Sequence, residues 1–493
     1  MKQAEVEYEF NPLDFIDESQ MLCNQMHGLN LTAKFKKIGV ETEEKDEKLC
    51  FTVIPTKFAE YLKKCITAKL LETGDIVLYL KKHGYYKPAT DLILGKICMY
   101  LMTQCGYCFW SSVNERKVID AYKRIMNEMV IAFDTDEVIN LKNGIYDLKT
   151  GKLIPHDPKY LCLGQVDAVY DPKAEAPFFI KFLKDICCYD LELVKVILEI
   201  IGYCLTKIIK AEKMFFFLGG GSNGKSVLVN CLTSLVGAHN VAAISLTDLS
   251  STGNKFVLEG LIGKYVNIAA ENEFQGKLNT ENLKKFVTGD VFDVQRKYKA
   301  ALQMRFPIKL VQVLNNLPEV ADLSYGFWRR VMVIPFNAKF EGADIDINMQ
   351  EKLESELPGI LNLALEALKN LEANDYKFSY CEAVEKETLK YEMAQKPAWQ
   401  FFTETYEFCE GNRILKTDLY DQYKHWSKVE GKEPVNVQTF WRTLKTEWKN
   451  KKIAYSLPKS NGVRYLSGFK EKNDFKTETG GDGSNVVLNI LHP

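Results

Sequence analysis

The sequence lacks a long apolar run. No stretch of about 18 residues is both apolar and free of charge, and the first residues, Met1 to Glu5, contain no hydrophobic signal-peptide segment. These absences exclude an ordinary membrane-spanning helix and a secretory leader. We therefore expect an intracellular protein with no membrane partner.

Neither sign of charge is in excess. The chain has 64 Lys and Arg against 65 Asp and Glu, a net charge of −1 over 493 residues. This balance excludes a protein that is basic throughout, but it allows a local basic face. The length is sufficient for several domains with apolar cores.

A disulfide framework is also missing. The thirteen cysteines are odd in number and include the adjacent Cys187 and Cys188. Cys105 and Cys108 form one CxxC pair with Cys98 nearby, a spacing that zinc sites use. No second CxxC pair and no closely spaced histidines supply further ligands, so we expect reduced, mostly buried cysteines and no zinc site.

One segment carries a specific signal. The apolar run 214–218 precedes GGGSNGKS, and the amphipathic run 227–232 follows it. Strand, glycine loop and helix in this order form a phosphate-binding loop, in which backbone N–H groups and the helix N-terminus face a polyphosphate. Lys225 is expected on the β and γ phosphates and Ser226 on Mg²⁺. The predicted nucleotide-binding residues are Gly219, Gly220, Gly221, Ser222, Asn223, Gly224, Lys225, Ser226 and Val227.

A second apolar run, 264–270, has the composition of a buried parallel strand and ends in Glu271, with Glu273 two residues further. A carboxylate at the carboxyl end of a strand beside a phosphate loop can hold Mg²⁺ and polarise the attacking water. The alternative is a strand that simply ends in solvent. We predict Glu271 as the metal-binding and catalytic acid.

Two further strands complete this pattern. The run 308–314 brings Asn315 to the same edge, where its amide can bond the γ-phosphate or the water. The run 331–334 follows Arg329 and Arg330. Any one of these groups could stand at a strand end by chance. That the glycine loop, Glu271, Asn315 and the two arginines all do so by chance is much less probable.

Taken together, these motifs resemble those of superfamily 3 helicases, and more closely the primase-helicase type of phages, plasmids and poxviruses. Five segments carry the resemblance between residues 219 and 336: GGGSNGKS, AAENE, LKKFVTGD, VLNNLPEV and GFWRRVMVIPF. It extends over about residues 130–375 through NGIYDLKTGKLIPHDP, YDPKAEAPFFIKFL and LPGILNLALEAL. The chain before residue 141 is too short for the primase domain of many relatives, and the first 85 residues match no motif.

The resemblance implies an AAA+-like ATPase that uses ATP and Mg²⁺. It would form a ring, expected to be a hexamer, and move 3′ to 5′ along single-stranded DNA. Lys225 and Ser226 would contact phosphate and Mg²⁺, and Glu271 would be the acid of the second nucleotide motif, with Glu273 as its companion. Asn315 would be the sensor. Arg330, or alternatively Arg329, would be the finger supplied by a neighbouring subunit. The implied partners are single-stranded and forked DNA, origin DNA and replication proteins, in bacterial or viral-host cytoplasm.

A DNA-contacting hairpin is predicted between the extended runs 291–294 and 301–305. Its tip is basic and contains one aromatic residue, a combination that can hold phosphates and stack on a base. Without the resemblance, a solvated charged turn would be the more common interpretation. The predicted contacts are Arg296, Lys297, Tyr298 and Lys299.

The carboxy-terminal region has a local basic excess. Residues 396–470 contain fourteen Lys and Arg against eight Asp and Glu. An amphipathic helix at 437–445 is followed by a turn at Asn461 and Gly462, between possible strands at 453–455 and 463–466, which suggests a winged helix. The alternative is a basic domain that contacts only protein. The predicted DNA contacts are Gln438, Arg442, Lys445 and Arg464.

The predicted fold class is α/β, with an AAA+-like P-loop ATPase core built on a parallel sheet. A mostly helical N-terminal region and a C-terminal winged-helix-like domain flank it. We expect helices over most of 78–129 and within 176–210 and 347–371, and a β-hairpin around Asn143 and Gly144. The predicted domains are 1–85 of unknown role, 86–210 helicase-associated, 211–375 ATPase, 376–395 linker, 396–470 winged-helix-like and 471–493 flexible tail.

The sequence leaves two principal alternatives to a helicase. A primase hidden in residues 1–140 would use Asp134 and Asp136 as metal-binding carboxylates, although a turn before the hairpin is the simpler interpretation of these residues. A DNA-binding initiator would use ATP only to assemble and would recruit a separate helicase. A P-loop kinase for small molecules explains neither the paired arginines nor the basic C-terminal region.

Overall fold

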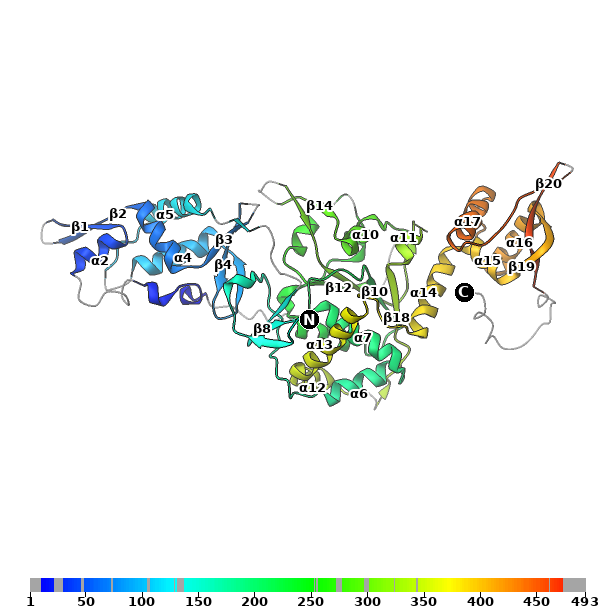
Figure 1. The fold of residues 1–493 in the computed structure, drawn as a ribbon, viewed down its shortest axis with the longest axis horizontal. Helices are drawn as coiled ribbons and strands as arrows, with labels where there is room; N and C mark the ends of the chain where they lie inside the picture. Colours follow the sequence, from blue (N-terminus) through cyan, green and yellow to red (C-terminus); the bar gives the residue numbers. More distant parts are fainter. Residues whose placement is uncertain are drawn as a thin grey trace. The chain divides into compact units, whose positions relative to one another are not determined.

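The computed structural model describes residues 10–21, 30–45, 48–71, 74–103, 107–127, 129–130, 137–251, 253, 256–271, 277–296, 301–322, 324–342, 345–460 and 462–472. The chain divides into two compact units (Figure 1). The first unit contains Met1–Asp322 and Arg329–Glu387, and the second contains Leu323–Trp328 and Thr388–Pro493.

The amino-terminal part of the first unit packs helices on a four-stranded sheet of order β5-β4-β3-β6. Its core is apolar and aromatic, with Phe35, Phe58 and Tyr122 fully buried. The elements are α2 (Leu31–Lys37), β1 (Val40–Lys45), β2 (Lys48–Val53), α3 (Pro55–Cys65), β3 (Ala68–Leu71), β4 (Ile76–Leu80), β5 (Tyr85–Pro88), α4 (Asp91–Met102), α5 (Ser112–Ile125) and β6 (Met129–Val130).

The expectation of helices over most of 78–129 is wrong for its first part. Residues 76–88 form the antiparallel pair β4–β5, and the helices begin only at Asp91. All five residues of β4 are buried. A strand buried on both faces is a continuous apolar run, which periodicity alone does not distinguish from a helix.

The middle part of the first unit follows the prediction closely. β7 (Val138–Leu141), β8 (Gly144–Asp147) and β9 (Lys152–Ile154) form an antiparallel meander, with the predicted turn at Asn143. α6 (Pro177–Ile186) and α7 (Leu191–Cys204) are the two expected helices. Asp190 caps α7, because its carboxylate accepts from the N–H groups of Glu192 and Leu193 at 3.0 Å.

A five-stranded parallel sheet is the centre of the first unit, and its order is β11-β12-β16-β10-β18. Its strands are nearly continuous apolar runs, as expected for a parallel sheet covered on both faces. The strands and their connections are β10 (Met214–Leu218), α8 (Lys225–Val236), β11 (Val241–Ala242), α9 (Leu246–Ser250), β12 (Val266–Glu271), β13 (Lys277–Leu278), α10 (Glu281–Thr288), β14 (Val291–Val294), β15 (Leu302–Arg305), β16 (Lys309–Leu314), β17 (Glu319–Val320) and β18 (Val331–Pro335).

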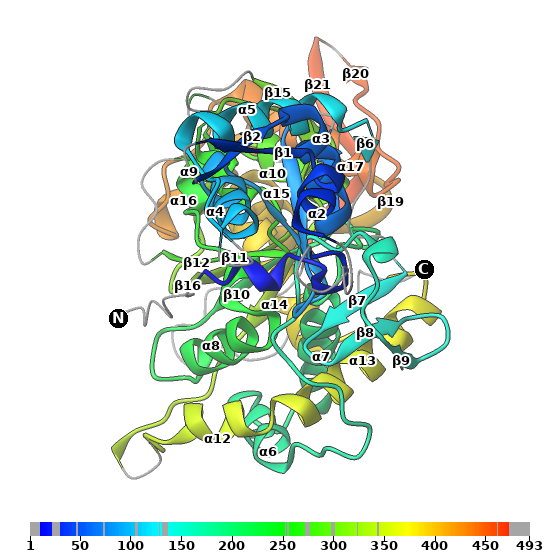
Figure 2. The ribbon, with the colours of Figure 1, turned by 90° about the vertical axis from the view of Figure 1, so that its left-hand side faces the viewer.

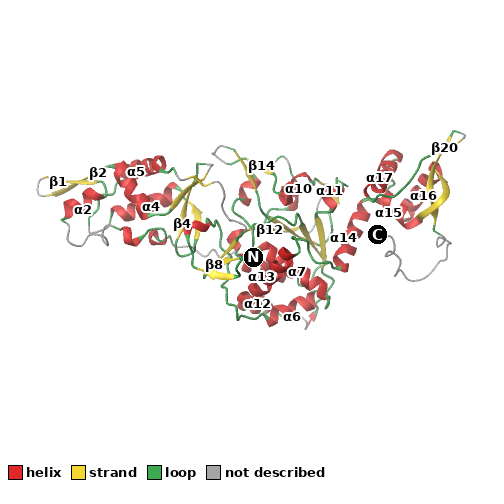
Figure 3. Cartoon of the chain, in the orientation of Figure 1, coloured by secondary structure: helices red, strands yellow, loops and turns green. Residues whose placement is uncertain are grey.

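Helices from before and after the sheet share one core with it. α12 (Met349–Ser355) and α13 (Leu357–Ala373) are the predicted closing helices. α13 lies against α7, on the same side of the sheet in Figures 1 and 2, and the alternation of helices and strands is visible in Figure 3. Short 3-10 helices complete the unit: η1 (Pro12–Asp14), η2 (Glu18–Gln20), η3 (Pro158–Tyr160), η4 (Ala238–Asn240) and η5 (Val257–Leu261).

The second unit is a small helical domain with a three-stranded sheet of order β19-β21-β20. The core is strongly aromatic, and Tyr423, Phe440 and Trp448 are fully buried. Besides α11 (Tyr325–Trp328), its elements are α15 (Pro397–Thr405), β19 (Tyr406–Leu415), α16 (Lys416–Val429), α17 (Val437–Asn450), β20 (Lys459–Ser460) and β21 (Val463–Glu471).

The segment 376–395, predicted as a linker, contains a helix, α14 (Glu382–Gln395), and the boundary between the two compact units falls within it, between Glu387 and Thr388. One sequence expectation is corrected here. The first strand of the carboxy-terminal hairpin is residues 459–460 instead of 453–455, although the turn at Gly462 is where the sequence predicts it. Within the described ranges, no helix combines the length and the apolar character that a bilayer crossing requires.

Candidate functional site

The glycine-rich segment lies at the carboxyl end of β10, which pairs in parallel with β16 on one side and β18 on the other. α8 begins at Lys225, directly after Gly224. Gly224 has a φ of 81°, and a Cβ there would collide with the side chain of Ile186 on α6. Glycine is therefore required at this position by both the backbone and the packing.

The interior of the loop holds a buried ammonium group. The Lys225 side chain donates from Nζ to the Gly219 carbonyl and to Asn223 Oδ1, the latter at 3.2 Å, and Lys225 is 4% exposed. Burial lowers the pKa of Lys225. Asn223 is fixed in turn, since its Nδ2 donates to the Phe336 carbonyl at 3.1 Å. The ammonium is thus positioned by oxygens that an anionic phosphate can replace.

The two sides of the loop differ in the space around them. A Cβ on Gly219 would collide with the amide of Asn223, so the inner side is filled. Around the positions that a Cβ would take on Gly220 and Gly221, no heavy atom of the described residues lies within 4 Å. The outer side is therefore open, and it has the form of a cradle for an anion at the start of α8.

The predicted carboxylate and amide come from strands that end at this loop. The register pairs Glu271 with Leu314, and Leu314 with Leu218, so these three residues lie level on neighbouring strands. Asn315 follows Leu314 and is exposed. Ser226 is exposed in the first turn of α8. The backbone positions of the predicted nucleotide residues therefore converge on one edge of the sheet, while Glu273 lies outside the described residues.

The paired arginines lie at the opposite edge of the same sheet. The Met214 N–H at the start of β10 donates to the Arg330 carbonyl at 2.8 Å, and both β10 and β18 run from there towards the loop. β10 and β18 are each five residues long, so the amino ends of these strands lie about 16 Å from their carboxyl ends, where the glycine loop begins. Neither arginine can therefore reach the glycine loop of its own chain.

The two arginines differ in exposure. Arg330 and Arg329 donate to the same Glu212 carboxylate, at 2.9 and 3.2 Å, but their side chains are 10% and 48% exposed. Lys213 Nζ also donates to the Arg329 carbonyl at 2.7 Å. Arg329 is therefore the arginine that a second molecule could contact directly.

The predicted hairpin is present, but one of its contacts differs from the expectation. β14 and β15 pair antiparallel, with Val294 opposite Leu302. Lys297, Tyr298 and Lys299 lie outside the described residues. Arg296 forms an ion pair of 2.6 Å with Asp75, which precedes β4, and its side chain is only 8% exposed. In this conformation the Arg296 guanidinium binds a carboxylate of the amino-terminal part.

The predicted residues of the second unit lie on an exposed surface. Gln438, Arg442 and Lys445 fall on one face of α17, and Arg464 is exposed on β21. Lys416, which begins α16 beside this surface, was not among the residues predicted from the sequence. The only signal for Lys416 was its contribution to the local charge excess.

Two alternative metal sites considered from the sequence lie wholly or partly outside the described residues. Cys105, Asp134 and Asp136 lie outside the described residues, and of the remaining cysteines Cys98 is buried and Cys108 is exposed. In the described part of the chain, one group could offer three metal ligands within 4.8 Å: Asp190, Glu192 and Cys381. Asp190 already caps α7, and Glu192 accepts from the Glu382 N–H at 3.4 Å.

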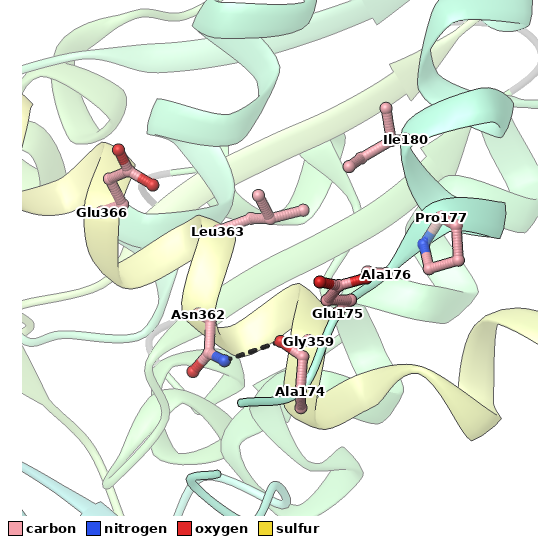
Figure 4. A pocket seen from close by; sticks show the side chains of 9 residues that line it. All are labelled: Ala174, Glu175, Ala176, Pro177, Ile180, Gly359, Asn362, Leu363 and Glu366. Atoms are coloured by element: carbon pink, nitrogen blue, oxygen red, sulfur yellow. Dashed lines mark hydrogen bonds between the residues drawn. The ribbon is translucent and has the colours of Figure 1, made fainter. Parts of the chain in front are cut away.

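A surface hollow of about 240 Å³ lies between residues 174–177, α6 and α13, away from the glycine loop (Figure 4). Asn362 closes its base by donating to the Ala174 carbonyl at 3.0 Å. None of the residues predicted from the sequence lines it. Its two carboxylates belong to Glu175 and Glu366, and the remaining lining is mostly apolar, so it offers no catalytic constellation.

Two family models match the chain. Residues 110–188 match the family described as D5 N terminal like, and residues 217–330 match DUF5906, a family of unknown function. The second match contains the glycine loop and both arginines. The first covers the meander and α6.

Several sequence relatives come from viruses. The chain is 27% identical over 215 residues to the candidate helicase L207/L206 of Acanthamoeba polyphaga mimivirus, covering 42% of this chain and 22% of that protein. It is 25% identical over 295 residues to the candidate primase C962R of African swine fever virus, covering 54% and 30%. The candidate helicase 184R of Invertebrate iridescent virus 6 is 24% identical, covering 45% and 24%.

The chain thus spans less than a third of the length of these relatives. A solved structure of the NrS-1 C-terminal region in its A form, without ligand, aligns with a TM-score of 0.49 at 14% identity, over 81% of this chain and 95% of that one. The D5 N terminal like match and the viral relatives named as helicases or primases together support a protein of the phage and viral primase-helicase superfamily.

Proposed function

We propose that this protein is a ring-forming, ATP-dependent DNA helicase that acts in the replication of a virus, phage, plasmid or other mobile element. The observation that carries the proposal is the convergence of Lys225, Glu271 and Asn315 on one sheet edge, with an open glycine cradle beside them. The viral relatives named as helicases support the same activity.

ATP would bind with its phosphates on the open side of the loop, where Lys225 exchanges its protein oxygens for phosphate oxygens. Glu271 would orient the attacking water, and Asn315 would bond the γ-phosphate. Ser226 and Glu271 are suited to hold Mg²⁺, whose charge would neutralise the phosphates. An adjacent subunit would have to supply the arginine, because Arg329 and Arg330 lie at the far edge of the sheet. Oligomerisation is therefore part of the proposed mechanism.

The β14–β15 hairpin is the proposed contact with single-stranded DNA, through Lys297, Tyr298 and Lys299 at its tip. Movement would follow the state of the γ-phosphate, and the direction implied by the resemblance is 3′ to 5′. We propose a ring of six subunits, because the resemblance also implies a hexamer.

The test is unwinding of a forked duplex with ATP and Mg²⁺. Lys225→Ala should abolish both ATP hydrolysis and unwinding, whereas Lys297→Ala with Lys299→Ala should spare ATP binding and impair unwinding. Lys285→Ala is the matched control, because Lys285 is an α10 lysine paired with Glu281 at 2.9 Å. Full unwinding by Lys225→Ala would refute the motor. ATP-dependent assembly on DNA without any strand separation would favour the initiator instead.

A further inference from the structure

Four cations from three elements gather on one surface of the second unit. Lys416 is the first residue of α16, Lys445 lies on α17, and Lys459 and Arg464 belong to the β20–β21 hairpin. Leu415 pairs with Tyr465 at the end of β19, so Lys416 and Arg464 are the chain neighbours of this pair. Lys459 pairs directly with Arg464.

The charges are close enough to act on one another. Lys416 Nζ lies 4.2 Å from the centre of the Trp441 ring, which is itself buried. Burial, followed by the positive charges of Lys445 and Arg464, lowers the pKa of Lys416. The indole therefore holds an ammonium group beside two other cations.

No described carboxylate forms an ion pair with any of these four side chains. Other lysines of the same unit are paired: Lys424 with Asp421 at 2.6 Å, Lys470 with Glu407 at 2.9 Å and the buried Lys396 with Glu447 at 2.8 Å. Gathering like charges without a counter-ion costs free energy, which an anionic ligand would recover.

The basic surface continues along α17. Arg442, Lys445 and Lys449 are exposed at helical spacing on one face, and the opposite face is anchored in the core by Phe440, Leu444 and Trp448. A helix of 14 residues is about 21 Å long, so its cations can contact several phosphates at once. The exposed positions of α17 carry no aromatic ring, which a platform for single-stranded nucleic acid would use for stacking.

We propose that this surface, formed by Lys416, Arg442, Lys445, Lys449, Lys459 and Arg464, binds the phosphate backbone of double-stranded DNA independently of ATP. The inference deepens the proposed function and rests on it only for the choice of DNA over RNA. It gives the motor a second DNA contact, which would hold the chain on the duplex ahead of the strand being separated.

The experiment measures binding of the full chain, without nucleotide, to a labelled DNA duplex, to one of its single strands and to an RNA duplex of the same sequence. Lys416→Glu with Lys445→Glu should weaken duplex DNA binding at least about tenfold. The number of counter-ions released on binding, given by the slope of the logarithm of the binding constant against the logarithm of the salt concentration, should fall by about two. Lys424→Glu, on α16 but outside the surface, is the control and should bind as the wild type does. ATP hydrolysis without DNA should be unchanged.

Unchanged duplex binding by the double variant would overturn the proposal, as would a loss of single-strand or RNA-duplex binding in that variant that is larger than its loss of duplex DNA binding. If the double variant melts at a lower temperature, Lys416→Gln with Lys445→Gln replaces it and should give a smaller loss in the same direction. Lys225→Ala should abolish unwinding and leave duplex binding intact. The proposed helicase activity and the proposed duplex-binding surface can therefore be refuted separately.

Discussion

Single residues in this protein owe their chemistry to partners that are remote in sequence. Asn223 holds Lys225 from within the loop, but it is itself fixed by Phe336, 113 residues later. A motif names Lys225 as the phosphate-binding residue. The pairing of Asn223 with the end of β18 explains why the ammonium already lies inside the loop.

Arg296 shows the opposite case, because a residue predicted to contact DNA is bound to a carboxylate. Asp75→Asn should release the guanidinium and strengthen binding of single-stranded DNA about threefold to tenfold, since a charged hydrogen bond of this kind contributes about 1 kcal/mol. Titration with a labelled oligonucleotide at low salt measures the effect.

Asp91→Asn is the matched control, because Asp91 pairs with Lys123 at 2.6 Å in the same part of the chain and lies away from the hairpin. If Asp75→Asn binds DNA no better than the control, or if Arg296→Ala binds it as the wild type does, Arg296 is a structural residue. Nothing in the sequence links Arg296 to Asp75, which is 221 positions away.

At the scale of elements, the turn from β10 into α8 uses its glycines for different reasons. Gly220 faces open space, whereas Gly224 has a positive φ and packs on Ile186. Gly220→Ala should therefore fold normally but weaken ATP binding, because the new methyl group would project into the cradle. Gly224→Ala should lower the free energy of unfolding by about 2 kcal/mol or more, from backbone strain and the clash together.

Gly263→Ala separates these two causes, because Gly263 has a φ of 78° and no described heavy atom within 4 Å of its Cβ position. Gly263→Ala should lower the free energy of unfolding by about 1 kcal/mol, from backbone strain alone. Denaturant unfolding gives the stabilities, and a fluorescent nucleotide gives the affinities. Equal unfolding free energies for Gly224→Ala and Gly263→Ala would contradict the packing argument.

Other elements show where sequence patterns are ambiguous. The hairpin β7–β8 was predictable from its Asn143-Gly144 turn, and the hairpin β14–β15 from a basic run between two extended segments. The buried β4 was mistaken for part of a helix, since burial on both faces removes the alternation that identifies a strand. The helical form of α14 was not part of the linker prediction, because the segment is charged and few of its positions, such as Val384 and Tyr391, are buried.

At the scale of the whole molecule, the sheet separates the two halves of the proposed active site. A subunit with Lys225→Ala keeps Arg329, and a subunit with Arg329→Ala keeps its loop. Each variant alone should lose about 10³-fold or more of its ATP hydrolysis. A mixture should regain activity at about a quarter of the interfaces under random assembly. Hydrolysis measured across mixing ratios should be greatest at equal amounts.

Additive, uniformly low activity across all mixtures would show that sites are not shared between subunits. Arg330→Ala gives the contrast, because Arg330 is buried beside Glu212 and its loss should lower the melting temperature of the single chain. Among the two candidates named from the sequence, exposure favours Arg329 as the residue that acts on a neighbour.

The sequence by itself determined the glycine loop, the strand that ends in Glu271, the paired arginines and the basic carboxy-terminal helix, because each depends on residues adjacent in the chain. Only the tertiary structure decided the strand order, which aligns Glu271 with Leu314 and Leu218 and sets Arg329 at the opposite edge. The tertiary structure alone also decided that Arg296 pairs with Asp75 and that Lys416 lies near Arg464. Such contacts join residues far apart in sequence, and the free energy that selects them comes from packing whole strands and helices, which no local pattern records.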